Sequence, residues 1–246
     1  MTKTLILIPS RMAATRLPGK PLLKINNLSI ISHVFKRAEE ANIGEVVVAT
    51  EDQEILEDVI KNGGRAIITN KYHKTGTDRI YEAYKKLGIK NIDYILNLQG
   101  DEPDINKDDI INLNKFMTNQ DVELGTLAAK IVDRKIFNNR NVVKVITDRK
   151  LEDNNFPEAL NFTRNDLSPD QKNIYHHIGI YSYKLNILEK FISLDQTNNE
   201  KKNKLEQLRA LDNKLKINVA LAKSSPTGVD TEEDYLAIKK IMEYKI

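Results

Sequence analysis

Short runs of β-branched and aliphatic residues alternate with amphipathic segments along the first half of the chain, and this alternation constrains the fold most strongly. The runs lie at 4–8, 45–50, 66–69 and 94–98, each about the length of a strand. Between them, apolar residues recur at helical spacing over 30–38 and 55–60, and Gly63-Gly64 offers a C-cap for the second helix. Strands alternating with helices predict βαβ units, and therefore an α/β fold with a Rossmann-like, mostly parallel sheet flanked by helices.

The pattern loosens from about residue 124 onward. Strands are expected at 127–132, 142–147 and 179–183, among Asn-rich loops. A helix near 202–211 and a strand at 217–222 follow, and Thr231 with Asp234 at N3 is expected to cap the last helix. Because no low-complexity linker divides the chain, we expect one domain over 1–246 with a smaller subregion at about 124–194 on the same sheet.

Charge and cysteine content narrow the class of protein. The 38 Lys and Arg against 35 Asp and Glu leave a net charge of +3, spread along the chain, which offers no footprint for nucleic acid. The absence of cysteine excludes disulfides, thiolate metal sites and Cys nucleophiles, and suits a reducing compartment. No apolar run is long enough for a signal sequence or a membrane span. We expect a cytoplasmic protein with no membrane partner.

The loop after the first strand, residues 9–21, reads PSRMAATRLPGKP and carries three cations. Arg11, Arg16 and Lys20 repel one another unless an anion lies among them, and a triphosphate provides such an anion. Open α/β sheets bind ligands at this edge, and Gly19 would allow close backbone approach. The alternative is a solvated basic loop. Neither a P-loop nor a Gly-x-Gly-x-x-Gly motif is present, so P-loop kinases and NAD enzymes lose support.

Two aspartates are candidate metal ligands. Asp101 follows the strand 94–98 after a tight Gln-Gly turn, and Asp230 lies after the strand 217–222 and just before a helix. Mg²⁺ takes one or two carboxylates together with phosphate oxygens and water, so two aspartates from distant loops meet its needs. The alternative is that Asp101 forms a turn and Asp230 introduces a helix.

Six blocks resemble one family, the 3-deoxy-manno-octulosonate (Kdo) cytidylyltransferases. They occur in family order and read IPSR with TRLPGKP at 8–21, TGTDR at 75–79, NLQGDEP at 97–103, HIGIY at 177–181, LEQLR at 205–209 and GVDT at 228–231. The resemblance implies a nucleotide-diphospho-sugar transferase fold and transfer of CMP from CTP to the anomeric hydroxyl of Kdo. The product, CMP-Kdo, would serve lipopolysaccharide synthesis. It also implies Mg²⁺ as cofactor and a homodimer, for which we expect contacts within 124–194.

The resemblance also assigns roles to residues. The implied catalytic residues are Lys20, Asp101, Asp230 and Arg11, of which Asp101 and Asp230 would hold the metal. The implied nucleotide-binding residues are Pro9, Ser10, Arg11, Arg16, Lys20, Thr75, Thr77 and Arg79. The implied acceptor-binding residues are Gln99, Arg164, His177, Tyr181, Glu206 and Gln207, with Arg164 on the sugar carboxylate. Plainer alternatives are strand packing for Tyr181, a surface strand position for His177, and a solvated helix face for Glu206-Gln207.

The chain departs from the family pattern at 165–169, where NDLSP replaces a small, apolar stretch. Asp166 there would favour the ammonium of an amino analogue of Kdo, which is the alternative acceptor. A milder departure is Asn26-Asn27 in place of a glycine turn, and Asn tolerates the left-handed conformation. Two rival functions are disfavoured. The acceptor-side blocks speak against a transferase of the same fold with a sugar phosphate or polyol phosphate acceptor, and the joint presence of Lys20, Asp101 and Asp230 speaks against a nucleotide-binding regulatory protein without turnover.

Overall fold

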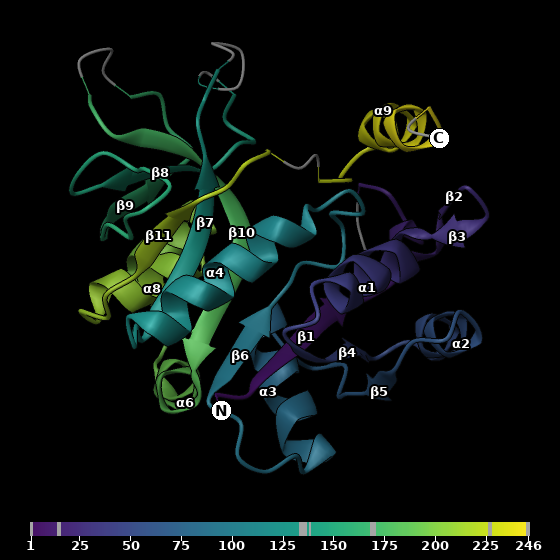
Figure 1. Ribbon diagram of the computed structural model, residues 1–246. Coiled ribbons are helices and arrows are strands. Elements are labelled where there is room, and N and C mark those ends of the chain that lie inside the picture. The colour runs from purple at the N-terminus through teal and green to yellow at the C-terminus, as the bar shows by residue number, and fades with distance from the viewer. Residues whose placement is uncertain are drawn as a thin grey trace. The chain divides into compact units, whose positions relative to one another are not determined.

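The computed structural model describes residues 2–13, 16–132, 137, 139–167, 171–225 and 228–244 (Figure 1). The chain divides into two compact units. The first unit comprises residues 1–110 together with 226–246, and the second comprises 111–225. The expected subregion at 124–194 falls within the second unit.

The first unit is built on four parallel strands in the order β6-β1-β4-β5. They are β1 (Thr4–Ser10), β4 (Gly44–Thr50), β5 (Ala66–Ile68) and β6 (Tyr94–Asn97), which confirms all four predicted strands. In the central strand, residues 5–8 are fully buried. Because the strands are parallel, the segments after β1, β4, β5 and β6 all emerge at one edge of the sheet.

Helices and a small hairpin complete this part of the unit. The helices are α1 (Ile30–Glu40), α2 (Gln53–Lys61) and α3 (Gly76–Leu87), with a short 3₁₀ helix η1 (Lys20–Leu22) before α1. Gly63 follows the end of α2 at φ 83°, as the predicted C-cap requires. The hairpin pairs β2 (Lys24–Ile25) with β3 (Leu28–Ser29), and its turn residues Asn26 and Asn27 take φ 48° and 64°. The asparagines thus supply the predicted left-handed turn.

The carboxyl-terminal segment returns to the first unit as α9 (Glu232–Glu243). Its N-terminus has the predicted capping box, in which Thr231 and Asp234 each bond the other's backbone N–H. Buried residues of the hairpin, α1 and this segment form a small core of Ile25, Ile30, Val229 and Ile238. This core fixes the start of α9, and therefore the position of the neighbouring Asp230.

The second unit has a mixed sheet in the order β11-β7-β10-β8-β9, in which only β11 and β7 are parallel. The strands are β7 (Leu124–Ala129), β8 (Lys144–Thr147), β9 (Ala159–Thr163), β10 (Ile174–Lys184) and β11 (Asn218–Leu221). The helices are α6 (Leu185–Ser193), α7 (Asn198–Asn203) and α8 (Gln207–Asp212). The boundary between the units falls within α4 (Lys107–Asn119).

The prediction of a single helix near 202–211 is wrong, because two short helices cover this region. Lys204 takes the left-handed conformation at φ 53° and ends α7, and α8 begins at Gln207. The two short helices are joined by a bidentate ion pair, because Arg209 Nε and Nη2 lie 2.9 and 2.7 Å from the carboxylate oxygens of Glu200. Both side chains are almost fully buried, at 3% and 4% exposed. Burial of this pair favours two packed helices over one continuous helix.

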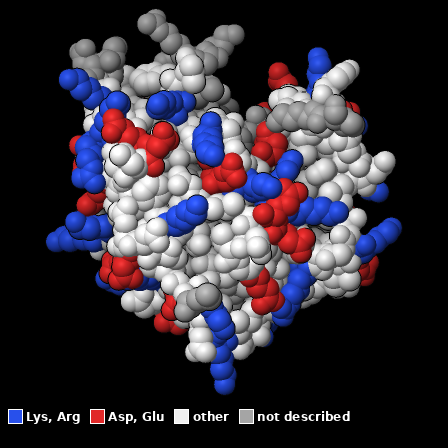
Figure 2. Space-filling model, viewed as in Figure 1, with Lys and Arg blue, Asp and Glu red and all other residues white. Residues whose placement is uncertain are grey.

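The charged side chains are mixed on the surface. On the face shown in Figure 2, basic and acidic residues are interspersed, as the nearly balanced composition leads one to expect. Among the described residues, no helix combines the length and the apolar character needed to cross a bilayer.

Candidate active site

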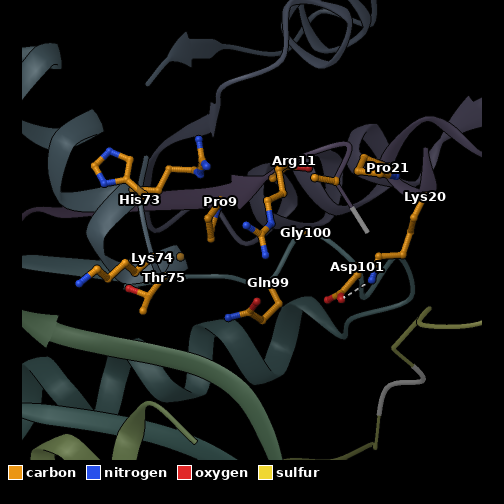
Figure 3. Close-up of a pocket in the computed structure, with 14 residues that line it drawn as sticks. Pro9, Arg11, Lys20, Pro21, His73, Lys74, Thr75, Gln99, Gly100 and Asp101 are labelled. Carbon is orange, nitrogen blue, oxygen red and sulfur yellow. Dashed lines mark hydrogen bonds and ion pairs between the residues drawn. The ribbon is translucent and has the colours of Figure 1, made fainter. Parts of the chain in front are cut away.

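A cavity of about 300 Å³ lies in the first unit, where the segments after β1, β5 and β6 emerge from the sheet (Figure 3). Its lining combines the end of β1, the cationic loop, the start of α3 and the turn after β6. The lining residues are Pro9, Ser10, Arg11, Ala13, Lys20, Pro21, His73, Lys74, Thr75, Gly76, Arg79, Gln99, Gly100 and Asp101. The structure thus gathers most of the predicted nucleotide-binding residues, with Gln99 and Asp101, around one cavity.

Two glycines shape the loops of the cavity. A Cβ on Gly100 would lie 3.0 Å from the carbonyl oxygen of Pro9 and 3.1 Å from a methyl of Ile31, so the turn after β6 needs glycine to pack this closely on β1. Gly19 takes φ 70°, the left-handed conformation, directly before η1. Gly19 therefore turns the chain so that Lys20 points into the cavity (Figure 3).

Lys20 lies between the two predicted metal ligands. Its Nζ is 2.8 Å from Asp101 Oδ2 and 3.3 Å from Asp230 Oδ1, and its side chain is only 13% exposed. Arg16 Nη2 approaches the other oxygen of Asp230 at 2.8 Å. Burial alone would lower the pKa of Lys20, but the two carboxylates outweigh burial and raise the pKa above its ordinary value. Lys20 is therefore protonated and positively charged in the site.

The two aspartates are brought together by backbone contacts. The N–H of Val229 donates to the carbonyl of Asp101 at 2.9 Å, and Val229 itself is fully buried in the core beneath α9. The N–H of Asp230 donates to Asp234 Oδ2 at 3.1 Å, so the start of α9 also fixes Asp230. Asp101 does lie in a turn after a strand and Asp230 does precede a helix, as the two alternative interpretations expected. These local structures also hold the two carboxylates in position.

The arrangement fits a magnesium–triphosphate complex. Within the described residues no group of three or more His, Asp or Glu side chains is placed to enclose a metal, but two carboxylates suffice when phosphate supplies further oxygens. The Lys20 ammonium already stands where a cation is held by Asp101 and Asp230. The neighbouring Glu102 adds little negative charge, because burial, and then Asp101 and Asp104, raise its pKa well above the usual value.

The remaining predicted nucleotide-binding residues differ in their surroundings. Arg11 is exposed and reaches into the cavity (Figure 3). The N–H of the next residue, Met12, donates to Asp52 at 2.7 Å and anchors the loop. Arg79 lines the cavity but is 3% exposed and ion-paired with Glu51. Thr77 is buried in α3, and its hydroxyl accepts from Asn97 at 3.5 Å. Arg79 and Thr77 therefore support the wall, whereas Arg11 is an accessible cation.

Sequence reasoning missed the two lining residues of the cavity that carry titratable side chains outside the predicted set. His73 and Lys74 lie at the end of the cavity opposite the Lys20–Asp101 pair (Figure 3). They directly precede the TGTDR block, whose Thr75 caps α3 with Asp78. Lys74 is a fourth cation, and it directly precedes the N-terminus of a helix, a place where phosphate groups often bind. This combination could have identified Lys74 from the sequence.

His177 and Tyr181, predicted to bind the acceptor, are neighbours on β10 in the second unit. Their ring centroids are 5.4 Å apart, and His177 Nε2 lies 3.0 Å from Thr126 Oγ1. Both residues are 8% exposed, so His177 is not a surface residue. Burial, and then His176 and Arg164, lower the pKa of His177 to about 3, so its ring is neutral. Burial, and then Tyr183 and Glu206, raise the pKa of the Tyr181 hydroxyl well above the usual value, against a smaller opposite effect of the Thr126 side chain.

The other acceptor-side predictions also lie in the second unit, except Gln99. Arg164 follows β9, and its Nη1 donates to the carbonyl of Asn141 at 2.5 Å. Glu206 directly precedes Gln207 at the start of α8 and lies 3.7 Å from Arg209. Asp166 forms an exposed ion pair with Arg140 at 2.8 Å, whereas Ser168 and Pro169 of the unusual loop lie outside the described residues.

Comparison with known proteins identifies the class and then the family. A family model described as cytidylyltransferase matches residues 5–217. The solved structure of a CMP:2-keto-3-deoxy-manno-octonic acid synthetase complexed with CTP is 33% identical, covers 100% of both chains and has a TM-score of 0.90. A UDP-glucose pyrophosphorylase structure, at 16% identity and TM-score 0.74, shares the fold alone. The fold and the family model are therefore those of a nucleotidyltransferase.

Curated relatives narrow the class to one family. A 3-deoxy-manno-octulosonate cytidylyltransferase of Rhodopseudomonas palustris is 44% identical over 99% of both chains. Another of Bartonella bacilliformis is 39% identical over 98% of both. The chain belongs to the 3-deoxy-manno-octulosonate cytidylyltransferase family.

Proposed function

We propose that this protein transfers CMP from CTP to the anomeric hydroxyl of Kdo, giving CMP-Kdo and pyrophosphate. The observation that carries the proposal is the Lys20 ammonium held by Asp101 and Asp230 in a cavity lined by basic side chains, in a chain of this family. A transferase for a sugar phosphate is less well supported, because the curated relatives match over nearly the full length, including the acceptor-side blocks. A binding protein without turnover has no need for this charged cluster.

The reaction is a substitution at the α-phosphorus of CTP. The oxygen of the anomeric hydroxyl forms a bond to the α-phosphorus while the bond from that phosphorus to the α,β-bridging oxygen breaks. Pyrophosphate leaves with its negative charge, and the hydroxyl proton passes to solvent. Arg11 and Lys20 stabilise charge that develops on the phosphates, and Arg16 neutralises the outer carboxylate oxygen of Asp230 until an anion draws it away. No protein nucleophile is required, because transfer of this kind depends on positioning and electrostatics.

Asp101 and Asp230 are the residues that would hold Mg²⁺. When bound, the ion would neutralise phosphate oxygens and polarise the phosphorus centre. Lys20 pairs with both carboxylates, so we expect its ammonium to exchange these partners for phosphate oxygens when the nucleotide binds with its metal. Thr75 and the backbone of Pro9 and Ser10, which line the same cavity, are proposed to surround the cytosine.

The acceptor site is proposed to use Arg164 for the carboxylate of Kdo and the polar groups of the second unit for its hydroxyls. Two features support this proposal. The Tyr181 side chain is buried next to the ring of His177, and its hydroxyl is a group that can pair with a ligand hydroxyl. Glu206, at the start of α8 and 3.7 Å from Arg209, adds a carboxylate, which is a group that accepts from a sugar hydroxyl.

The experiment is incubation of the purified protein with CTP, Mg²⁺ and Kdo, with release of pyrophosphate and formation of CMP-Kdo measured directly. Parallel reactions with 8-amino-Kdo, a sugar 1-phosphate and no acceptor separate the alternatives. We expect turnover with Kdo in preference to its amino analogue, since the exposed Asp166 is already paired with Arg140. Pyrophosphate release with a sugar phosphate and not with Kdo would refute the acceptor assignment.

We also propose a homodimer, formed through residues within 124–194, that acts in the cytoplasm and supplies CMP-Kdo for lipopolysaccharide synthesis. The family resemblance of the sequence supports these proposals. Light scattering at micromolar concentration tests the dimer, because a single species of 28.1 kDa would contradict it.

A further inference from the structure

The wall of the cavity opposite the Lys20–Asp101 pair is formed by the segment 73–75 (Figure 3). Lys74 and Thr75 line the cavity from a segment that connects β5 to α3. The backbone of such a connection has no strand or helix of its own to hold it. Its geometry therefore depends on side-chain contacts with the neighbouring helix.

Glu82, on the second turn of α3, provides those contacts. Its carboxylate accepts hydrogen bonds from the ring of His73 through Nε2 and from the backbone N–H of Asn70 at 2.9 Å. Lys86, one turn further along the helix, lies 2.6 Å from the other carboxylate oxygen. Partial burial would raise the pKa of Glu82, but the bonds from Lys86, Asn70 and His73 lower it to about 2. The Glu82 carboxylate is therefore ionised at neutral pH, and it binds the segment at Asn70 and at His73.

A separate set of contacts holds the two ends of the segment. Arg79 donates to the Thr69 hydroxyl at 2.7 Å and pairs with Glu51 at one end. The capping box between Thr75 and Asp78 holds the other end. Between these ends, His73 is a side chain that both lines the cavity and reaches back to α3.

We propose that His73 and Glu82 form a positioning pair that fixes the 70–75 segment, and with it Lys74 and Thr75, for nucleotide binding. This proposal rests on the proposed function. Because a carboxylate only accepts, Nε2 of His73 carries the proton and is occupied by Glu82. His73 therefore acts through the position of the wall and does not transfer a proton through Nε2.

The test is a double-mutant cycle of Glu82→Gln and His73→Gln in the full chain, with two measurements. The first is trypsin cleavage of the nucleotide-free protein after Lys71 and Lys74, which reports on the segment without any ligand. We expect faster cleavage in both single variants, and no further increase in the double variant, because both changes break the same contact. The second is calorimetric titration with CTP and Mg²⁺, where we expect each single variant to bind CTP about tenfold more weakly.

Lys86→Met is the matched control, since it removes a partner of Glu82 but leaves the bond to His73 in place. It should retain the segment's resistance to trypsin and its CTP affinity. At saturating CTP, the turnover and the KM for the acceptor should change less than about threefold in Lys86→Met, because Lys86 does not line the nucleotide cavity. Unchanged trypsin cleavage in both single variants, or fully additive effects in the double variant, would overturn the positioning pair. A wild-type protein that binds no CTP would instead refute the proposed function, while the trypsin result would still decide whether the pair holds the segment.

Discussion

The Lys20 ammonium lies 2.8 Å from Oδ2 of Asp101, and it also approaches Asp230 at 3.3 Å. The two aspartates are separated from Lys20 by 81 and 210 positions in the chain. One cation therefore joins a strand turn and a helix entry at the edge of the sheet where the cationic loop begins. Two of the following predictions depend directly on this cluster.

Replacement of either aspartate should remove activity and leave the fold intact. We expect Asp101→Asn or Asp230→Asn to lower turnover at least about a hundredfold, since charged groups at a reacting centre commonly contribute that much. Pyrophosphate release under saturating CTP and Kdo is the measurement. Glu233→Gln, an exposed carboxylate in the first turn of α9, is the control and should remain near wild-type. Near-normal turnover in either aspartate variant would contradict the metal assignment.

Replacement of Lys20 should change metal binding and turnover in opposite directions. In Lys20→Met the carboxylates of Asp101 and Asp230 lose their resident cation, so the nucleotide-free protein should bind Mn²⁺ more tightly, measured by the free-ion EPR signal. Turnover should fall more than CTP affinity, because the ammonium matters most as charge develops in the transition state. Lys24→Met changes an exposed lysine nearby and serves as the control. Weaker Mn²⁺ binding in Lys20→Met would refute the idea that Lys20 competes with the metal.

Glu206 should act on the acceptor and not on the nucleotide. We expect Glu206→Ala to raise the KM for Kdo about tenfold, as loss of a hydrogen bond to a charged group typically does, while CTP affinity is unchanged. Initial rates with Kdo varied at saturating CTP measure the effect. Asp212→Ala on the same helix, where Asp212 bonds Thr197 and Asn199, is the structural control. Equal losses of CTP and Kdo affinity would indicate damage to the fold instead.

His177 should make the folded protein sensitive to acid. Its folded-state pKa of about 3 lies below the ordinary value of 6.5, so between these values the unfolded chain binds a proton that the folded chain does not. The free energy of unfolding should therefore fall as pH decreases through this window. In His177→Asn the decrease should be smaller, which urea denaturation at about pH 7 and about pH 5 would measure. An equally steep decrease in the variant would contradict burial of the neutral ring.

Much of the first unit could be predicted because its signals are local. The run at 4–8 forms β1, the asparagines at 26 and 27 form the left-handed turn, and Thr231 caps α9 with Asp234. Each of these depends on residues within a few positions of one another. The prediction of one helix near 202–211 failed because the deciding contact is not local to one turn of helix. The buried Glu200–Arg209 pair favours two packed helices, and helical spacing does not report such a pair.

The sequence by itself determined the alternation of strands and helices, the cationic loop after β1 and the identity of the family. Tertiary structure alone decided that Lys20 lies between Asp101 and Asp230, that Glu82 binds His73 on the wall of the cavity, and that His177 is buried and neutral. The physical reason is the range of the interactions. Hydrophobic periodicity and capping act between near neighbours in the chain, whereas ion pairing and burial depend on which distant segments the packed sheet and helices bring together.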